Sequence, residues 1–347
     1  MNISEMLAEQ VNRLFVDRIN RQMWVDAESG HPAVALWSEV EGMGITLAMT
    51  AEEQGGAGLS WADSEPMLRV CGLHAAPLPL GETAVAGWAL SSAGLEVPSG
   101  PLAVSTQQYR LDEQGRLHGR DAQLSWLPLA GHVVLTAERE GVSFVCLVDA
   151  KKGSQTQVDT LDRLPCAEWI LSGVMPQQFA TAPLALMKET LRPHIAVLRS
   201  IQMAGALARV LELCVDYANT RVQFGKPIGS FQAIQHMIAD LAAQAAAAQV
   251  AGLYAARQID AGNPFQAAAV AKTLVGKAAG RAAAIAHQVF GAIGVTEEHS
   301  LHYYTRRLWQ WRSDAGSEQW WAERIGFQVL DAGSAALWPR LTKPIQA

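Results

Sequence analysis

The sequence has few charged side chains and lacks the signatures of several broad classes of protein. Charged residues make up 17% of its 347 residues, half of the residues are apolar, and the formal net charge is −6. The lack of a long basic stripe argues against a nucleic-acid partner. No apolar run reaches the length that spans a bilayer, and the N-terminus lacks the basic start of a secretory signal. We therefore expect a globular, cytoplasmic protein without a membrane span that acts on a small molecule.

Cysteine is also scarce, and its spacing excludes two kinds of site. The four cysteines show no Cys-x-x-Cys spacing, so we expect neither a metal site nor a disulfide framework, but buried thiols in a reducing compartment. The Gly-rich run at 55–58 lacks the Lys-Ser or Lys-Thr of a phosphate-binding loop, which favours a turn. The cysteines are Cys71, Cys146, Cys166 and Cys214.

The patterns of apolar residues predict a mainly α protein with a small β-domain. We expect a helical N-terminal domain over 1–97, a β-domain over 98–180 and a C-terminal four-helix bundle over 181–347. Ser60 is predicted to cap an N-terminal helix. The alanine-rich C-terminal helices are predicted to pack closely, within a bundle or between subunits. The predicted strands are 102–105, 123–126, 132–136, 142–148 and 168–171. The predicted C-terminal helices are 184–222, interrupted near Pro193, then 231–261, 264–290 and 318–335.

One segment joins two of these helices and carries most of the functional signal. It reads Tyr217-Ala-Asn-Thr-Arg-Val-Gln-Phe-Gly-Lys-Pro-Ile-Gly-Ser-Phe-Gln-Ala-Ile-Gln-His236. Gly225 and Pro227 interrupt the helical pattern, and Ser230 is predicted to cap the second helix. The guanidinium of Arg221 and the N-terminus of the new helix both suit a diphosphate. Spacing alone also fits an ordinary helix–loop–helix corner.

The pattern Arg-x-Gln-Phe-Gly-Lys-Pro-Ile-x-x-Phe-Gln-x-x-Gln in this segment resembles the signature of the FAD-dependent acyl-CoA dehydrogenases. Further pieces follow in that family's order: Glu52-Glu-Gln-Gly-Gly-Ala-Gly58, Pro77-Leu-Pro-Leu-Gly-Glu82 and Gln288-Val-Phe-Gly-Ala-Ile-Gly-Val-Thr-Glu-Glu-His299. The resemblance spans nearly the whole chain and is strongest over 198–299. It implies an acyl-CoA dehydrogenase-like fold, a role in lipid metabolism, FAD as cofactor and an acyl-CoA thioester as substrate.

The resemblance also assigns cofactor contacts, shared between subunits, and so implies a homo- or hetero-oligomer. An electron-transfer flavoprotein is the acceptor it implies. By resemblance, Trp126 lies near the flavin ring, although core packing is the simpler interpretation. The implied contacts are Arg221 and Gln223 with the diphosphate region, Phe231 and Gln232 with the adenosine half, Gln288 and Gly291 with a neighbouring subunit's FAD, and Ser317 and Gln319 with the dinucleotide after the catalytic loop.

The family's usual catalytic base is missing from this sequence. In many members a glutamate precedes the glycine of a Tyr-Glu-Gly segment, and Ala315 stands at that position here. Other members carry the glutamate on an earlier helix, where this chain has Ile195. Neither side chain can accept a proton. The chain therefore resembles a short variant of the family that lacks its catalytic glutamate.

Three explanations of the missing base stay open. Asp314 or Glu318 serves as an unconventional base, a partner subunit carries the glutamate, or the chain uses its flavin for another reaction, such as that of an oxidase or monooxygenase. A non-catalytic structural subunit is the non-enzyme alternative. His194 is a further candidate base because its pKa can lie near neutrality. A histidine on a helix face is, however, more often structural.

Three other groups of residues invite a functional interpretation. Glu297, Glu298 and His299 look like an acid–base or metal cluster, but adjacent side chains do not converge on one point. Arg306 and Arg307 suit either a phosphate or carboxylates at a subunit contact. Core or interface packing is the default for the tryptophans near the C-terminus. These are Trp309, Trp311, Trp320, Trp321 and Trp338.

Overall fold

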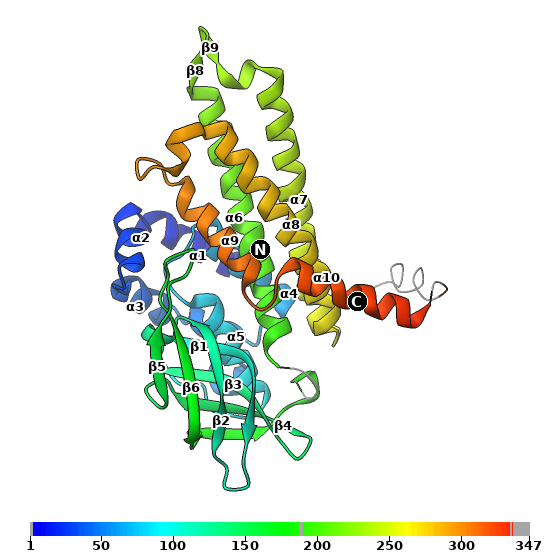
Figure 1. Ribbon diagram of the computed structural model, residues 1–347. Coiled ribbons are helices and arrows are strands. Elements are labelled where there is room, and N and C mark those ends of the chain that lie inside the picture. Colours follow the sequence, from blue (N-terminus) through cyan, green and yellow to red (C-terminus); the bar gives the residue numbers. More distant parts are fainter. Residues whose placement is uncertain (1–2, 187–189, 334, 336–347) are drawn as a thin grey trace. The chain divides into compact units, whose positions relative to one another are not determined.

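The computed structural model describes residues 3–186, 190–333 and 335 (Figure 1). It confirms a mainly helical fold with a β-domain. The chain divides into two compact units: Met1–Leu68 with Ala76–Leu198, and Arg69–Ala75 with Arg199–Ala347. Two helices, α4 (Trp61–Leu73) and α6 (Arg192–Thr220), run from one unit into the other. The division at 97 and 180 stays a prediction.

The first unit begins with short helices around a buried one. Ser60 caps α4 as predicted, because its Oγ accepts a bond from the backbone N–H of Asp63 at 3.1 Å. The helix α5 (Leu80–Ser92) is buried from Leu80 to Gly87 and packs against the first strand of the sheet. The other helices here are α1 (Ile3–Arg18), α2 (Arg21–Glu28) and α3 (Val34–Gly42).

The β-domain is a seven-stranded sheet in the order β5-β6-β2-β1-β3-β4-β7. The central pair β1 and β3 runs parallel and the other neighbours are antiparallel. All five predicted strands are present, but β5 and β7 were not predicted, and β5 has only exposed polar residues. The strands are β1 (Leu102–Leu111), β2 (Leu117–Ser125), β3 (His132–Arg139), β4 (Val142–Asp149), β5 (Ser154–Gln157), β6 (Cys166–Val174) and β7 (Gln178–Thr181).

The second unit is a helical bundle centred on α8 (Pro264–Phe290), which contacts α7, α9 and α10. The buried face of α8 is mostly alanine, which lets its neighbours approach closely. The predicted helix start at residue 184 is wrong: α6 begins at Arg192, with Pro193 in its first turn, where the missing N–H costs nothing. The neighbours are α7 (Gln232–Asp260), α9 (Leu301–Ser313) and α10 (Glu318–Ala332).

Two glycines let the end of α4 lie directly against α6 within the second unit. A Cβ atom on Gly72 would lie 1.8 Å from the carbonyl oxygen of Gln202. A Cβ atom on Gly205 would lie 2.0 Å from the carbonyl oxygen of Arg69. The two backbones are therefore in contact, and no larger residue fits at either position.

The cysteines are buried free thiols, as the sequence predicts. Burial raises the pKa of Cys146 to about 12, so its reactive thiolate is not populated near neutral pH. Among the described residues, no helix combines the length and apolarity needed to cross a bilayer.

Candidate functional site

The segment between α6 and α7 forms an exposed hairpin at one end of the bundle (Figure 1). The strands β8 (Val222–Gln223) and β9 (Lys226–Pro227) pair across Phe224 and Gly225. These two residues have φ of 52° and 80°, the double left-handed conformation of a type I′ turn. The predicted break in the helix at Gly225 and Pro227 is confirmed, and it takes the form of a tight hairpin.

The start of α7 has no side-chain cap, so the prediction that Ser230 caps it is wrong. The residue before the helix is Phe231, and the Ser230 hydroxyl instead donates to the carbonyl of Pro227 at 2.7 Å. A short 3-10 turn at Ile228–Ser230 points the serine away from the helix. The first N–H groups of α7 therefore have no side-chain acceptor, which leaves the positive end of the helix open to an anion.

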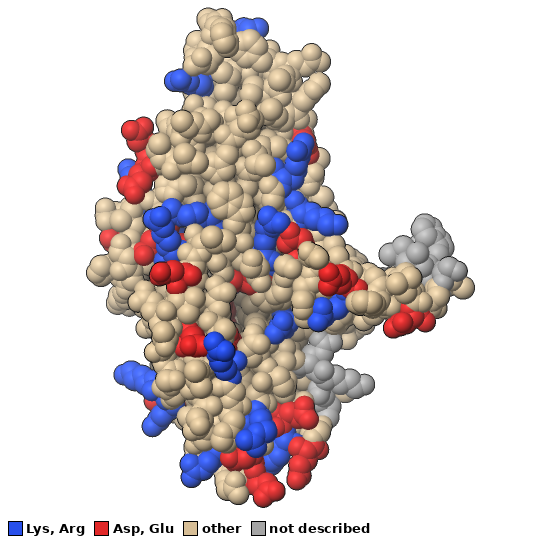
Figure 2. Space-filling model, viewed as in Figure 1, with Lys and Arg blue, Asp and Glu red and all other residues tan. Residues whose placement is uncertain are grey.

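The polar side chains of the hairpin are exposed and unused. Within the part of the chain that the structure describes, Arg221, Gln223 and Gln232 form no side-chain hydrogen bond or ion pair, and all three are exposed. The ammonium of Lys226 lies 4.5 Å from the centre of the Phe231 ring and adds a second positive charge. On the face that Figure 2 shows, the hairpin end carries basic and no acidic side chains. These donors and charges fit a diphosphate.

The C-terminal end of α8 lies beside the same hairpin. The ring of Tyr217, in the last turn of α6, stacks on Phe290 with the ring centres 4.3 Å apart. Gln288 is exposed in that last turn of α8, and Gly291 follows it with φ of 63°. Six of the eight residues assigned to the dinucleotide therefore gather at one end of the bundle. They are Arg221, Gln223, Phe231, Gln232, Gln288 and Gly291.

The other two assigned residues, Ser317 and Gln319, lie elsewhere. They begin α10, and the adjacent Glu318 side chain packs over Gly276 of α8. Gly276 is fourteen residues before Phe290, or about 21 Å along the helix axis. Ser317 caps α10 by accepting from the N–H of Trp320 at 3.2 Å, and the exposed Gln319 donates to Glu323. The eight assigned residues therefore lie in two separate groups, and their contact with a dinucleotide stays a prediction.

The loop from α9 to α10 contains Ala315, which the resemblance places at the position of the family's base. Ala315 has a left-handed φ of 55°, and its carbonyl accepts a bond from the indole N–H of Trp321 at 3.1 Å. A Cβ atom on Gly316 would lie 2.9 Å from that indole nitrogen, so the loop packs tightly on α10. The loop is ordered by its contacts, but its side chain at the base position is a methyl group.

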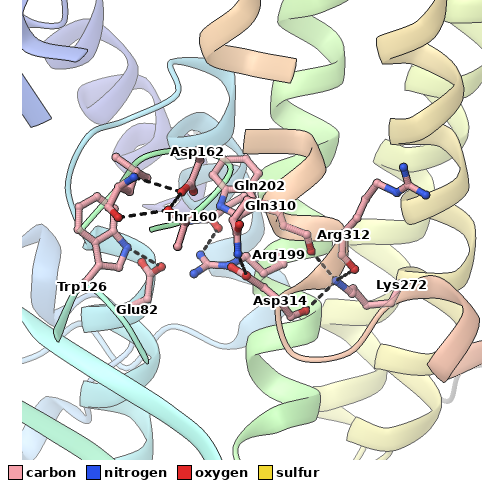
Figure 3. A network of polar contacts seen from close by, with 12 residues as sticks. Glu82, Trp126, Thr160, Asp162, Arg199, Gln202, Lys272, Gln310, Arg312 and Asp314 are labelled. Carbon is pink, nitrogen blue, oxygen red and sulfur yellow. Dashed lines mark hydrogen bonds and ion pairs between the residues drawn. The ribbon is translucent and has the colours of Figure 1, made fainter. Parts of the chain in front are cut away.

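Asp314, one of the two candidate bases, has partners on both of its carboxylate oxygens. Its Oδ2 pairs with Nε of the buried Arg199 at 2.9 Å, and its Oδ1 accepts from Gln310 at 2.7 Å (Figure 3). Arg199 also donates to Gln202 at 2.8 Å. Both carboxylate oxygens are occupied, and protonating Asp314 would leave a buried guanidinium without its counter-charge.

Glu318 is likewise engaged in an ion pair, with Arg312. Burial works to raise the pKa of Glu318, but the hydrogen bond and charge of Arg312 outweigh it, so the pKa is lower than usual. Gly276 and Gly280 of α8 leave room for this pair, because a Cβ on either would crowd Glu318 or Arg312. A carboxylate with a lowered pKa in an ion pair is a poor proton acceptor.

Lys272 supports the same loop and was not singled out from the sequence. It is completely buried in α8 and donates to the carbonyls of Trp311, Arg312 and Asp314. Burial lowers its pKa to about 7, against the nearby charge of Asp314, which works to raise it. Lys272 is the first charged residue after Asp260, in a run of apolar and small residues, and that isolation was a usable signal.

His194 and Ile195 lie in the interior of the first unit. The His194 ring is fully buried, with its centre 4.8 Å from Trp88 and 5.8 Å from Trp61. Neither ring nitrogen has a hydrogen-bond partner among the described residues, and burial lowers the pKa to about 3. Ile195 is 4% exposed. His194 is therefore packed as a neutral ring in the core, which favours the structural interpretation.

Trp126 is a core residue of the first unit, as the simpler interpretation predicts. It is 4% exposed and packs with Ala27 and Leu164. Its indole N–H donates to the buried carboxylate of Glu82 at 3.0 Å (Figure 3). This bond satisfies the polar group of a side chain whose ring is out of solvent. Its nearness to a flavin ring stays a prediction.

The remaining candidates have structural contacts. Glu297 and Glu298 are exposed while His299 packs on Phe290, and the described residues contain no cluster of metal-ligating side chains. Arg306 lies over the ring of Tyr303, and Arg307 is buried, so Arg307 cannot take a phosphate from solvent. The tryptophans divide into the buried Trp311 and Trp321, the half-buried Trp320, the partly exposed Trp309, and Trp338, which lies outside the described residues.

Comparisons with known proteins identify one family. Residues 187–328 match the model of the acyl-CoA dehydrogenase C-terminal domain. The acyl-CoA dehydrogenase IpdE2 of Mycobacterium tuberculosis is 32% identical over 277 residues, which cover 79% of this chain and 80% of that protein. The same-named protein of Mycolicibacterium smegmatis is 28% identical, covering 77% of this chain and 78% of that protein.

Solved structures share the fold over nearly the whole chain. A Tcur3481–Tcur3483 steroid ACAD variant has a TM-score of 0.85 at 24% identity and covers 95% of this chain and 98% of its own. The ChsE4–ChsE5 complex from Mycobacterium tuberculosis has a TM-score of 0.84 at 21% identity and covers 96% of this chain and 99% of its own.

Proposed function

This chain belongs to the acyl-CoA dehydrogenase family, and from that premise we propose that it is the base-lacking subunit of a heteromeric, FAD-dependent acyl-CoA dehydrogenase. The observation that carries the proposal is the lack of a carboxylate at the expected base positions. By resemblance, Ala315 and Ile195 stand at the two positions where family members carry the base, and Asp314 and Glu318 are held in ion pairs. In this proposal, a related partner chain supplies the glutamate.

The reaction divides between cofactor and protein. When bound, FAD supplies the redox chemistry by accepting the β-hydrogen of the thioester as hydride. The partner's carboxylate would take the α-proton, so that the product is an enoyl-CoA. The electrons would then pass to an electron-transfer flavoprotein. We expect the reaction to take place in the cytoplasm. This chain would contribute binding. Arg221 and the open N-terminus of α7 would hold the diphosphate, and the Phe231 face would lie against the adenosine half.

The exposure of the hairpin supports a shared cofactor. Three polar side chains are exposed to solvent and form no hydrogen bond within the described chain: Arg221, Gln223 and Gln232. A dinucleotide needs a concave site that buries most of its surface, which an exposed hairpin does not form alone. A neighbouring subunit would close the site. Two structural relatives are named as pairs of proteins, Tcur3481–Tcur3483 and ChsE4–ChsE5, which is consistent with a heteromer.

The experiment is co-expression of this chain with a related chain that carries the glutamate, followed by measurement of bound FAD. We expect a stable complex containing FAD, and at least about tenfold weaker FAD binding in the complex with Arg221→Ala. Arg257→Ala is the matched control, because Arg257 is exposed on α7 near the end opposite the hairpin. Equal FAD affinity of the two variants would contradict the assignment of Arg221.

A further inference from the structure

Lys272 is a buried cation that belongs neither to the base nor to the assigned cofactor contacts. Its ammonium lies 2.5 Å from the carbonyl oxygen of Trp311, 3.1 Å from that of Arg312 and 2.8 Å from that of Asp314 (Figure 3). The last carbonyls of a helix have no partner within the helix, and a cation there is favoured by the helix dipole. Lys272 thus caps the C-terminal end of α9 from inside the bundle.

The rest of the α9–α10 loop is held from other directions. The Asp314 side chain is fixed by Arg199 and Gln310, and the Ala315 carbonyl by Trp321. The backbone where α9 passes into the loop depends on Lys272 for three acceptors at once. Without the ammonium, three buried carbonyls would lose a bond at the point that sets the direction of the loop.

The lysine has a cost as well as a contribution. Burying an ammonium costs several kcal/mol of desolvation, and the other buried residues of α8 are mostly alanine and other small or apolar residues. An unbranched apolar side chain would avoid that cost but would leave the three carbonyls without their donor. The lysine therefore adds a fixed geometry for the loop and for the start of α10.

We propose that Lys272 is a positioning residue for the bound dinucleotide. By holding the end of α9, it sets where Ser317 and Gln319 stand at the start of α10. This inference rests on the proposed function, in which those two residues contact FAD. It adds that the contact is made by a loop whose geometry is fixed in advance by a residue that does not itself touch the cofactor.

The test compares Lys272→Met with Ile285→Ala in the full chain, together with its partner if the partner is needed for FAD binding. Met keeps the length of the side chain and removes the donor. Ile285 is buried in the same helix, thirteen residues away, and its truncation opens a cavity far from the loop. The measurements are the FAD dissociation constant, the melting temperature and hydrogen exchange of the amides over 311–319.

We expect Lys272→Met to weaken FAD binding at least about tenfold and to speed exchange over 311–319. Ile285→Ala should lower the melting temperature while keeping the FAD affinity within about twofold. Lys272→Gln retains one donor group and should give intermediate values, and it replaces the Met variant if that variant does not fold.

Unchanged FAD affinity in Lys272→Met, or an equal loss in Ile285→Ala, would overturn the inference. If the wild-type protein binds no FAD even with its partner, the proposed function fails. The exchange measurement then tests only whether Lys272 holds the α9–α10 loop. Unchanged exchange over 311–319 would then show that Lys272 does not hold the loop.

Discussion

The buried imidazole of His194 should make the protein sensitive to mild acid. Its pKa falls from the ordinary 6.5 to about 3 because the ring is fully buried between Trp61 and Trp88. The folded state therefore stays neutral at pH values at which the unfolded chain binds a proton. The stabilisation from this group is complete above pH 6.5 and is lost as the pH falls toward 3.

The size of the effect follows from the two pKa values. The full difference is worth at most about 5 kcal/mol, at 1.36 kcal/mol per pH unit, and about 2 kcal/mol of it is lost by pH 5. His194→Phe replaces the imidazole with a ring that fits between two tryptophans and does not titrate. When the pH changes from 7.5 to 5, the unfolding free energy of the variant should fall by about 2 kcal/mol less than that of the wild type.

The assay is urea unfolding at both pH values, followed by the fluorescence of the tryptophans that flank His194. The comparison of two differences removes the contribution of every other titrating group. The same loss of unfolding free energy in the wild type and in His194→Phe would refute the assignment of a neutral, buried imidazole. A His194→Leu variant should behave like the Phe variant if the charge, and not ring stacking, is the cause.

Other predictions concern single contacts. Asp314→Asn should lower the unfolding free energy by about 3 kcal/mol, because it leaves the buried Arg199 without its counter-charge. Thermal unfolding measures this loss, and a variant as stable as the wild type would contradict the pairing. Gly205→Ala should lower the unfolding free energy by about 1–3 kcal/mol in the same assay, because its Cβ would meet the Arg69 carbonyl. The control Gly326→Ala adds a Cβ in open space on α10 and should be neutral or stabilising. Glu318→Gln should leave turnover of the heteromer within about threefold of the wild type in a steady-state assay; a loss of several orders of magnitude would make Glu318 the base.

The sequence was informative where local chemistry decides the structure. Apolar runs bounded by turn residues predicted the five central strands, and Gly225 with Pro227 predicted the break between α6 and α7. Local patterns failed at β5, because an edge strand with exposed Ser, Gln and Thr has no alternating apolar side chains. They also failed at Ser230, because the 3-10 turn before α7 directs its hydroxyl to Pro227.

The candidate site was proposed from a motif, and its tertiary contacts were not visible in the sequence. The signature segment led to Arg221 and Gln223, and counting along the chain led to the absence of a carboxylate at 315. The partners of Asp314 and Lys272 were not predictable, because they come from helices distant in the sequence. The sequence shows Asp314 beside Ala315 but not its ion pair with Arg199, which is a tertiary contact and argues against Asp314 as a base.

The central claim is that this chain lacks a base of its own and needs a related subunit to dehydrogenate an acyl-CoA. The most direct measurement is an anaerobic single-turnover titration with a panel of acyl-CoA thioesters, following the absorbance of bound flavin. We expect stoichiometric bleaching in the FAD-loaded complex with a partner that carries the glutamate, and no bleaching in the same complex when that glutamate is replaced by Gln. Bleaching by the isolated chain would contradict the claim.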